Sequence, residues 1–281
     1  MTWDGRDMNE GVSRNRVSVV IPVFNEKATI AELIRRVQDV DIDKEIVIVD
    51  DNSTDGTRDV LQQIISSTEG QLVGAGKFTG GSASMVRGDV SGVSDSSGQT
   101  AAAPLCSGNL RVFFQDRNRG KGAAVRRGIQ EARGDLILIQ DADLEYDPRD
   151  YGALLDPIDR GMADVVYGSR FLGGPHRVLY FWHLVGNKTL TLISNMFTNL
   201  GLTDVWTCYK VFRREVLQSF ELKENRFGFE PEVTAKVSHG RWVVFEVPIS
   251  YNGRTYAQGK KITWRDAFRA IWCVVRYGVF K

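Results

Sequence analysis

The sequence has few cysteines and histidines, and their spacing excludes several kinds of site. Its 281 residues include three cysteines, Cys106, Cys208 and Cys273, which are far apart and odd in number. That pattern fits neither a zinc motif nor a complete disulfide framework. His239 has no Ser, Cys or second His at a spacing that suits a catalytic triad or a metal site. We therefore expect a protein of a reducing, cytoplasmic compartment.

Long apolar runs and an excess of one charge are also lacking. No uninterrupted apolar run approaches the roughly 20 residues that cross a bilayer as a helix, and residues 1–15 lack the apolar segment of a signal peptide. Lys and Arg total 36 against 35 for Asp and Glu, and this near balance gives no reason to expect a nucleic-acid partner. We expect no membrane span, a disordered tail over residues 1–15 and one catalytic domain over residues 16–255.

Strand and helix patterns alternate along the chain. A β-branched apolar run at residues 17–23 precedes helical spacing at 28–40, and a second run at 45–49 precedes helical spacing through residue 65. Two such units in succession indicate a parallel sheet with crossover helices. We expect an α/β fold with a mostly parallel central sheet and helices on both faces. The further strands are expected at 110–114, 136–139, 164–167, 208–212 and 242–247, and the further helices at 118–132, 148–160, 184–200, 232–238 and 262–277.

Residues 68–108 interrupt this alternation. They are rich in Gly, Ser, Ala and Thr and poor in large apolar residues, so the segment cannot bury enough surface to offset the entropy of ordering it. We expect a flexible insertion within the domain. A tolerated surface excursion is the interpretation we prefer over a functional lid.

Two carboxylates follow a short apolar run. Asp141 and Asp143 come directly after residues 136–140 and stand one residue apart. Ligands of open α/β sheets bind outside the carboxyl ends of the strands, and carboxylate oxygens suit Mg²⁺ or Mn²⁺ that also holds phosphate oxygens. The alternative is a solvated acidic turn.

A second acidic loop follows the run at 45–49. Asp50 and Asp51 lie at its end, with Ser53, Asp55 and Gly56 behind them. Such side chains can accept hydrogen bonds from a base and from ribose hydroxyls. They also make tight turns and helix caps, which is the structural alternative. The two acidic loops together favour a ligand site.

With these loops, the sequence resembles the family-2 inverting glycosyltransferases of the GT-A fold, and among them the dolichyl- or polyprenyl-phosphate mannose and glucose synthases. The resemblance extends from residue 17 to about residue 277, outside the insertion. Its motifs are residues 19–26 (VVIPVFNE), 50–57 (DDNSTDGT), 118–122 (NRGKG), 141–144 (DADL), 168–170 (GSR) and 246–249 (EVPI).

The resemblance implies roles for particular residues. A metal, Mg²⁺ or Mn²⁺, would be held by Asp141, Asp143 and Glu145. The groups that act on the reacting atoms would be Asp143, Arg170 and Glu232. The nucleotide sugar would be bound by Pro22, Phe24, Glu26, Asp50, Asp51, Lys121, Asp141 and Ala142, and the donor and acceptor phosphates by Arg170, Arg177, Arg254, Lys260 and Lys261.

The implied reaction moves mannose or glucose from a nucleotide-diphosphate sugar, GDP-mannose or UDP-glucose, to dolichyl or undecaprenyl phosphate. A phosphomonoester is anionic near neutral pH and can attack without a general base. The alternative is transfer to a hydroxyl of a saccharide, lipid or small molecule, which would need Glu230 or Glu232 as a base. A further alternative is a non-catalytic module that binds sugar nucleotides.

The carboxyl-terminal region, residues 256–281, combines aromatic and basic residues on one expected helix. Trp264, Phe268 and Trp272 alternate there with Arg265 and Arg269, as in helices that lie in a membrane interface. We expect an amphipathic helix that rests on the cytoplasmic face of a membrane. The alternative is a helix packed on the domain, and residues 184–200 leave the same two interpretations open.

Overall fold

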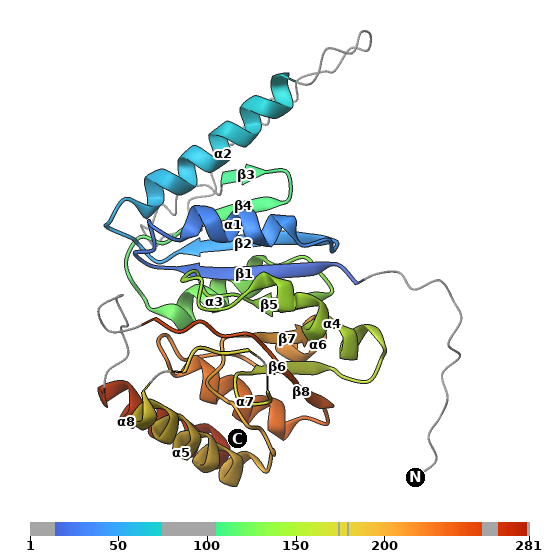
Figure 1. The fold of residues 1–281 in the computed structure, drawn as a ribbon, viewed down its shortest axis with the longest axis vertical. Helices are drawn as coiled ribbons and strands as arrows, with labels where there is room; N and C mark the ends of the chain where they lie inside the picture. Colours follow the sequence, from blue (N-terminus) through green and yellow to red (C-terminus); the bar gives the residue numbers. More distant parts are fainter. Residues whose placement is uncertain (1–14, 75–104, 174, 179, 255–263, 280–281) are drawn as a thin grey trace, which may run out of the picture.

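A central eight-stranded sheet organises the molecule (Figure 1). The structure is a computed structural model and describes residues 15–74, 105–173, 175–178, 180–254 and 264–279. The strand order is β3-β4-β2-β1-β5-β7-β6-β8. The strands are β1 (Val17–Val23), β2 (Lys44–Asp50), β3 (Leu105–Ser107), β4 (Leu110–Phe114), β5 (Leu136–Ile139), β6 (Val165–Ser169), β7 (Lys210–Arg213) and β8 (Val244–Pro248).

The first half of the sheet is parallel around β1. Strand β1 pairs in parallel with β2 on one side and with β5 on the other, and β4 continues the parallel order beyond β2. Every residue of β1, β2 and β5 is buried, as expected for strands covered on both faces. The carboxyl ends of β1, β2 and β5 therefore open at one edge of the sheet.

The second half departs from this order at one strand. Strand β7 runs antiparallel between β5 and β6, and β8 pairs with β6 in parallel. Strands β6 and β8 therefore end at the same edge as β1, β2 and β5. The predicted mostly parallel sheet with helices on both faces is confirmed (Figure 1).

The helices connect these strands. They are α1 (Ile30–Asp39), α2 (Thr57–Gly74), α3 (Lys121–Glu131), α4 (Tyr151–Asp159), α5 (Phe181–Thr198), α6 (Arg214–Gln218), α7 (Phe229–His239) and α8 (Trp264–Val279), with a 3₁₀ turn at Pro148–Asp150. Helix α8 lies against both α5 and α7. In the part of the chain that the structure describes, none of the helices combines the length and hydrophobicity needed to cross a bilayer.

The expected insertion at residues 68–108 begins and ends inside regular elements. Helix α2 continues to Gly74, and β3 pairs antiparallel with β4 from Leu105 onward. The remaining residues of the expected insertion, 75–104, lie outside the described residues, as do residues 1–14 of the expected tail. Regular structure thus extends into both ends of the range that composition assigned to the insertion.

Candidate active site

The loops after β1, β2 and β5 each contain a residue in the left-handed region. Asn25, Asn52 and Leu144 have φ angles of 54°, 62° and 60°. Asparagine tolerates this conformation, whereas a leucine there is strained, and such strain collects at functional sites. Leu144 directly follows Asp143. The backbone geometry therefore singles out this edge of the sheet.

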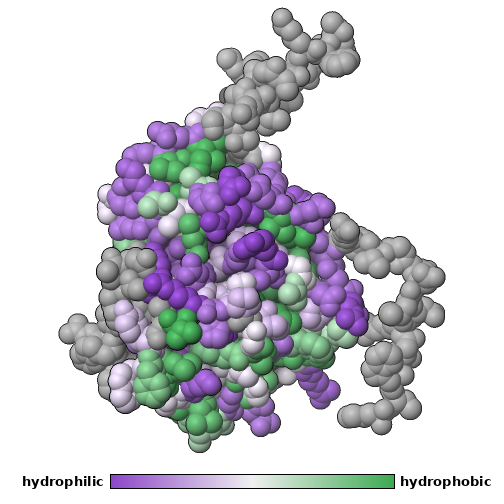
Figure 2. All heavy atoms as spheres, in the orientation of Figure 1, coloured by the Kyte–Doolittle hydropathy of each residue, from purple (hydrophilic) through white to green (hydrophobic). Residues whose placement is uncertain are grey.

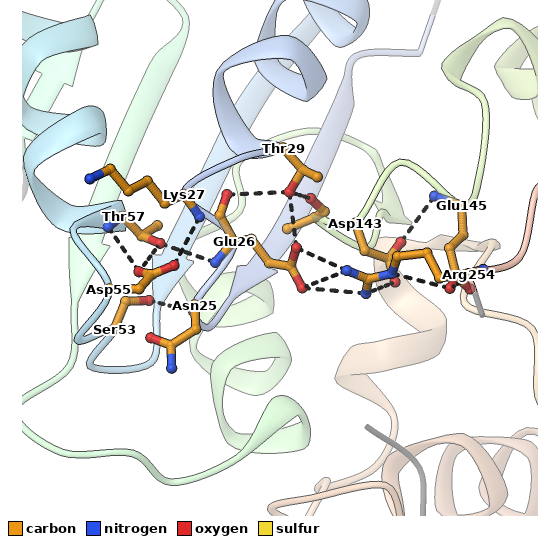
Figure 3. A network of polar contacts seen from close by, with 11 residues as sticks. Asn25, Glu26, Lys27, Thr29, Ser53, Asp55, Thr57, Asp143, Glu145 and Arg254 are labelled. Atoms are coloured by element: carbon orange, nitrogen blue, oxygen red, sulfur yellow. Dashed lines mark hydrogen bonds and ion pairs between the residues drawn. The ribbon is translucent and has the colours of Figure 1, made fainter. Parts of the chain in front are cut away.

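The loops after β1 and β2 are bound to each other (Figure 3). The Asn25 N–H donates to Ser53 Oγ at 2.9 Å, and the Glu26 N–H donates to Thr57 Oγ1 at 3.0 Å. Asp55 Oδ1 accepts from the Thr57 N–H at 3.0 Å, which caps the start of α2. The residues at 53–57 thus make the turn and cap that were the structural alternative for this motif.

Asp50 and Asp51 are both buried and engaged by protein donors. Asp50 is fully buried and accepts from Arg58 Nε at 2.6 Å. The two oxygens of Asp51 accept from the N–H groups of Arg119 and Gly120 at 2.8 and 2.7 Å. Burial raises the pKa of the Asp51 carboxyl, although these two hydrogen bonds oppose the shift. Asp50, which was predicted to bind the nucleotide sugar, has its carboxylate in the protein interior, and Asp51 holds the loop at 118–120 in place.

Close packing at Gly120 positions Lys121. Gly120 has a φ of 94°, and a Cβ on it would lie 2.4 Å from the carbonyl oxygen of Asn225, so only glycine fits there. The contact places Lys121 at the start of α3 with its Nζ 2.9 Å from both Asp141 Oδ1 and Glu230 Oε1. Burial lowers the pKa of the Lys121 ammonium, but the charges of Asp141 and Glu230 outweigh it and hold that pKa well above its ordinary value.

The guanidinium of Arg254 joins three carboxylates from two loops, those after β1 and β5 (Figure 3). Its Nη2 lies 2.9 Å from Asp143 Oδ2, its Nη1 lies 3.3 Å from Glu26 Oε2, and its Nε lies 3.3 Å from Glu145 Oε1. The structure thus brings together four residues that the sequence predicted. A single positive charge faces three negative ones, which leaves a local excess of negative charge.

Glu145, the third predicted metal ligand, is engaged by protein donors. Its Oε2 accepts from the Tyr251 hydroxyl at 2.7 Å, and its Oε1 accepts from the Arg254 N–H at 2.9 Å. Among the described residues, no group of three or more His, Cys, Asp or Glu side chains is placed to hold a metal ion. The role of Glu145 as a metal ligand therefore stays a prediction.

The remaining donor pair still fits a divalent cation. Asp141 and Asp143 offer hard carboxylate oxygens and are partly exposed at the sheet edge, as Mg²⁺ and Mn²⁺ sites require. Burial and the charges of Asp141 and Glu145 raise the pKa of the Asp143 carboxyl to about 7, despite the Arg254 guanidinium. Additional positive charge at this position would relieve the repulsion between the acids. Asp141 and Asp143 would hold such an ion with oxygens of a bound diphosphate.

Arg170 is committed to a buried partner. Its Nε and Nη2 lie 2.6 and 2.8 Å from the two carboxylate oxygens of Asp204, which is fully buried. The guanidinium carbon also lies 5.0 Å from the centre of the Tyr251 ring. Such a bidentate pair is not readily exchanged for another anion. Arg170, which was predicted to act on the reacting atoms and to bind phosphate, thus pairs with Asp204 and lies beside the ring of Tyr251 in this structure.

Glu232 serves the fold. It is fully buried, and its oxygens accept from the N–H groups of Lys223 and Glu224, each at 2.7 Å, and from Lys236 Nζ at 2.5 Å. Both carboxylate oxygens of Glu232, which was predicted to act in catalysis, thus face protein donors. Its neighbour Glu230, which faces Lys121, is the acid that reaches the site.

The other predicted residues are placed as follows. Pro22 is buried within β1, and Phe24 is exposed just beyond it. The carbonyl oxygen of Ala142 accepts from Thr29 Oγ1 at 2.8 Å. Arg177 is exposed, and its Nη1 donates to the carbonyl oxygen of Gly253 at 3.3 Å. Lys260 and Lys261 lie outside the described residues.

Sequence reasoning missed three residues that connect the site. Thr29 Oγ1 is 2.9 Å from Glu26 Oε2 and 2.8 Å from the carbonyl oxygen of Ala142, and so links the loops after β1 and β5. Tyr251 orients Glu145, and Asp204 orients Arg170. Thr29 precedes the first residue of α1, a position where threonine is a familiar cap, and that was the available signal. Nothing in the local sequence marks Tyr251 or Asp204.

Comparison with known proteins agrees with this arrangement. The chain is 25% identical over 271 residues to a polyprenol monophosphomannose synthase of Mycolicibacterium smegmatis, covering 94% of this chain and 87% of the relative. It is 25% identical over 250 residues to a dolichol-phosphate mannosyltransferase of Pyrococcus furiosus, covering 87% of this chain but 59% of that relative. The shared region is therefore well under two thirds of the second protein.

A solved structure supports the fold. Glucosyl-3-phosphoglycerate synthase of Mycobacterium tuberculosis, in complex with Mn²⁺, uridine diphosphate and phosphoglyceric acid, superposes with a TM-score of 0.63 at 17% identity, covering 96% of this chain and 80% of that one. This likeness confirms the predicted GT-A type fold.

The family assignment comes from the sequence profile of Glycosyl transferase family 2, which matches residues 18–74 and 93–220. The two matched blocks leave out residues 75–92, inside the segment expected to be an insertion. They include the loops after β1, β2 and β5, and with them Glu26, Asp141 and Asp143. The chain thus belongs to glycosyl transferase family 2 and is a glycosyltransferase.

Proposed function

We propose that the protein transfers a hexose, mannose or glucose, from a nucleotide-diphosphate sugar to the phosphate of a polyprenyl phosphate, with inversion at the anomeric carbon. GDP-mannose and UDP-glucose are the candidate donors, and dolichyl and undecaprenyl phosphate are the candidate acceptors. The names of the curated relatives, a polyprenol monophosphomannose synthase and a dolichol-phosphate mannosyltransferase, support this assignment. The site of action is the cytoplasmic face of a membrane, where the acceptor is embedded.

The observation that carries the proposal is the state of the two acids at the start of α7. A hydroxyl acceptor needs a general base, for which Glu230 and Glu232 are the candidates. Glu232 accepts from two backbone N–H groups and an ammonium, and Glu230 is paired with Lys121. A phosphomonoester needs no base because it is already anionic. The engagement of Glu232 therefore favours a phosphate as the nucleophile, and Glu230, whose Oε2 has no hydrogen-bond partner among the described residues, is the one of the two acids that could serve a hydroxyl acceptor as a base.

Several residues of the chain would have separate roles around the donor diphosphate. Asp141 and Asp143 would hold Mg²⁺ or Mn²⁺, which as a Lewis acid neutralises charge on the departing nucleotide diphosphate. Lys121 and Arg254 supply fixed positive charge on the two sides of these aspartates. Glu26 and Glu145 orient Arg254. Tyr251 and Arg170 in turn hold Glu145 and its surroundings in place.

Transfer of labelled sugar tests this proposal. The purified protein is incubated with GDP-mannose or UDP-glucose and either a polyprenyl phosphate or the matched polyprenol, which lacks only the phosphate. We expect labelled lipid with the phosphate alone, in the presence of Mg²⁺ or Mn²⁺ and not after chelation. Label on the polyprenol or on a saccharide would favour the hydroxyl-transferring alternative. Binding of nucleotide sugar without transfer or hydrolysis would favour the non-catalytic module.

A further inference from the structure

Strand β7 begins with a lysine that is fully buried. Lys210 pairs with Ile139 of β5 on one side and with Tyr167 of β6 on the other. Lysine side chains normally lie at the surface, and Figure 2 shows hydrophilic residues over much of the upper part of this view. A buried ammonium is costly unless a nearby charge compensates it. The surroundings of Lys210 therefore indicate what its charge does.

The position of Lys210 in the sheet is close to the candidate site. Ile139 is the last residue of β5, and Asp141 follows it by two residues. Because β7 runs antiparallel to β5 and β6, the first residue of β7 lies where these two strands come to their carboxyl ends. Lys210 thus lies at the edge of the sheet from which Asp141 and Asp143 extend.

The ammonium of Lys210 contacts two neutral groups. Its Nζ donates to the carbonyl oxygen of Thr207 and lies 5.0 Å from the centre of the Tyr167 ring. A carbonyl dipole and an aromatic face both attract a cation. Since both partners are neutral, neither of them cancels the charge of the ammonium. That charge remains available to act on an anion nearby.

Glu230 is the anion whose charge acts most on Lys210. The Tyr167 hydroxyl lies 3.0 Å from Thr234 Oγ1, which donates to the carbonyl oxygen of Glu230 at 2.8 Å. Burial lowers the pKa of the Lys210 ammonium to about 8, and the negative charge of Glu230 opposes this shift. Within the described residues, Glu230 Oε2 is buried without a hydrogen-bond partner. Two ammonium groups, those of Lys121 and Lys210, therefore act on one carboxylate.

The two lysines differ in what they can reach. Lys121 is partly exposed and bridges Asp141 and Glu230, so it can turn toward a phosphate only by leaving an acid. Removing one partner of a buried ion pair is strongly unfavourable, because the other charge is left uncompensated. Lys210 is fixed below the site by its own contacts. A fixed cation near Glu230 lowers the cost of the departure of Lys121.

We propose that Lys210 is a positioning residue for Lys121, because its buried charge balances Glu230 while Lys121 contacts the diphosphate of the donor. This inference rests on the proposed function, from which it takes a nucleotide diphosphate as the ligand of Lys121. The alternative is a lysine that only completes the packing of β7. The two roles differ in whether the effect of Lys210 depends on Glu230.

A double-mutant cycle on donor binding tests this dependence. Calorimetry measures the Kd of GDP and of UDP, each with Mg²⁺, for wild type, Lys210→Met, Glu230→Gln and the double variant. Lys210→Met should weaken binding of the nucleotide by about tenfold, because Lys121 then stays with Glu230. In the Glu230→Gln background the same substitution should change the Kd by less than about twofold, because no charge remains to be balanced.

The matched control is Lys44→Met. Lys44 is also buried at the start of a strand, and its ammonium donates to two backbone carbonyl oxygens, those of Gln38 and Val40. It lies at the opposite edge of the sheet, so its substitution should leave the Kd unchanged. Lys210→Gln keeps a donor for the Thr207 carbonyl oxygen and should reproduce Lys210→Met. It replaces that variant if urea denaturation shows the methionine protein to be unfolded.

The outcomes separate this inference from the proposed function. An unchanged Kd in Lys210→Met would leave Lys210 with a packing role, and an equal loss in both backgrounds would show a general effect of its charge. Either result would overturn the inference. A wild type that binds the nucleotide but transfers sugar to neither polyprenyl phosphate nor polyprenol would overturn the proposed function, while the cycle still decides on Lys210. A wild type that binds neither nucleotide would overturn both.

Discussion

Two acidic pairs lie at the ends of neighbouring strands, yet their surroundings differ. Asp50 and Asp51, after β2, are buried and receive hydrogen bonds from backbone N–H groups, at Ser53 for Asp50 and at 119–120 for Asp51, with Arg58 as a further partner of Asp50. Asp141 and Asp143, after β5, are partly exposed and meet the side chains of Lys121 and Arg254. Whether an acidic pair can release its protein partners and bind a ligand instead therefore depends on the partners and not on the acids.

The acids at the start of α7 repeat this difference. Glu232 accepts from the backbone N–H groups of Lys223 and Glu224, whereas Glu230 meets the side chain of Lys121. A backbone donor cannot leave its acceptor unless the loop itself opens. A lysine or arginine side chain can turn toward a phosphate while the fold stays intact. Acids of the first kind stabilise the protein, and acids of the second kind are available for chemistry.

The largest expected effect is at Asp143. Asp143→Ala should lower sugar transfer by about 10³ or more, because it removes one of the two residues proposed to hold the activating cation. The free energy of unfolding, measured by urea denaturation, should stay close to that of wild type. Asp39→Ala, which removes an exposed acid on α1, is the matched control and should leave transfer unchanged. Metal-dependent turnover that survives in Asp143→Ala would place the cation elsewhere.

Asp50 should behave in the opposite way. Asp50→Ala leaves the Arg58 guanidinium without its buried partner and should lower the free energy of unfolding by about 3 kcal/mol. The KM for the donor, measured on the folded protein, should change little by comparison. If the KM for the donor rose strongly while the urea midpoint stayed constant, Asp50 would act in donor binding and not in stability.

Substitutions of Arg254 test whether a side-chain partner of the acids can leave them and bind the donor phosphate. Arg254→Ala should lower kcat/KM for the donor by about 10², as expected when a charge-assisted contact to phosphate is lost. Arg254→Lys should recover part of the loss, because lysine keeps the charge but lacks the planar fork. A titration of both variants with nucleotide sugar gives the comparison. Equal activity of wild type and Arg254→Ala would show that Arg254 only stabilises the loops.

The smallest effect separates Glu232 from Glu230. Glu232→Gln should lower the free energy of unfolding by about 1 kcal/mol, since the amide places a donor where two backbone N–H groups need an acceptor. Its pH–rate profile should keep the wild-type shape. Glu230→Gln should leave stability almost unchanged and lower kcat/KM several-fold through Lys121. If the fall in rate at low pH disappeared in Glu232→Gln, Glu232 would be the general base.

The sheet and its loops could be predicted because they depend on local pattern. Apolar runs mark the strands, and the acids that follow them mark the edge where ligands bind. The partners of those acids could not be predicted. Asp51 is held from residues 119 and 120, and Arg254 gathers acids from two distant loops. Spacing along the chain does not encode such contacts, so Asp50 and Asp143 looked alike in the sequence.

The orientation of α5 was ambiguous for a different reason. Helical spacing of Leu192 and Met196 indicates that one face of the helix is apolar, but it does not say what covers that face. In the structure Thr191 and Ser194 are buried, so the apolar face points away from the domain. A few polar residues within a mostly apolar segment do not show in the sequence which face of the helix is buried.

The position of Arg254 has a consequence for the order in which ligands bind. The arginine is a counter-ion tethered to the chain, so dilution cannot remove it from Glu26 and Asp143. A divalent ion that arrives alone must compete with this resident charge at its high local concentration. When the ion arrives with a nucleotide diphosphate, the phosphate oxygens can accept hydrogen bonds from the Arg254 guanidinium. The guanidinium can then leave the carboxylates without losing its partners. Metal and donor would therefore bind together, each raising the affinity for the other.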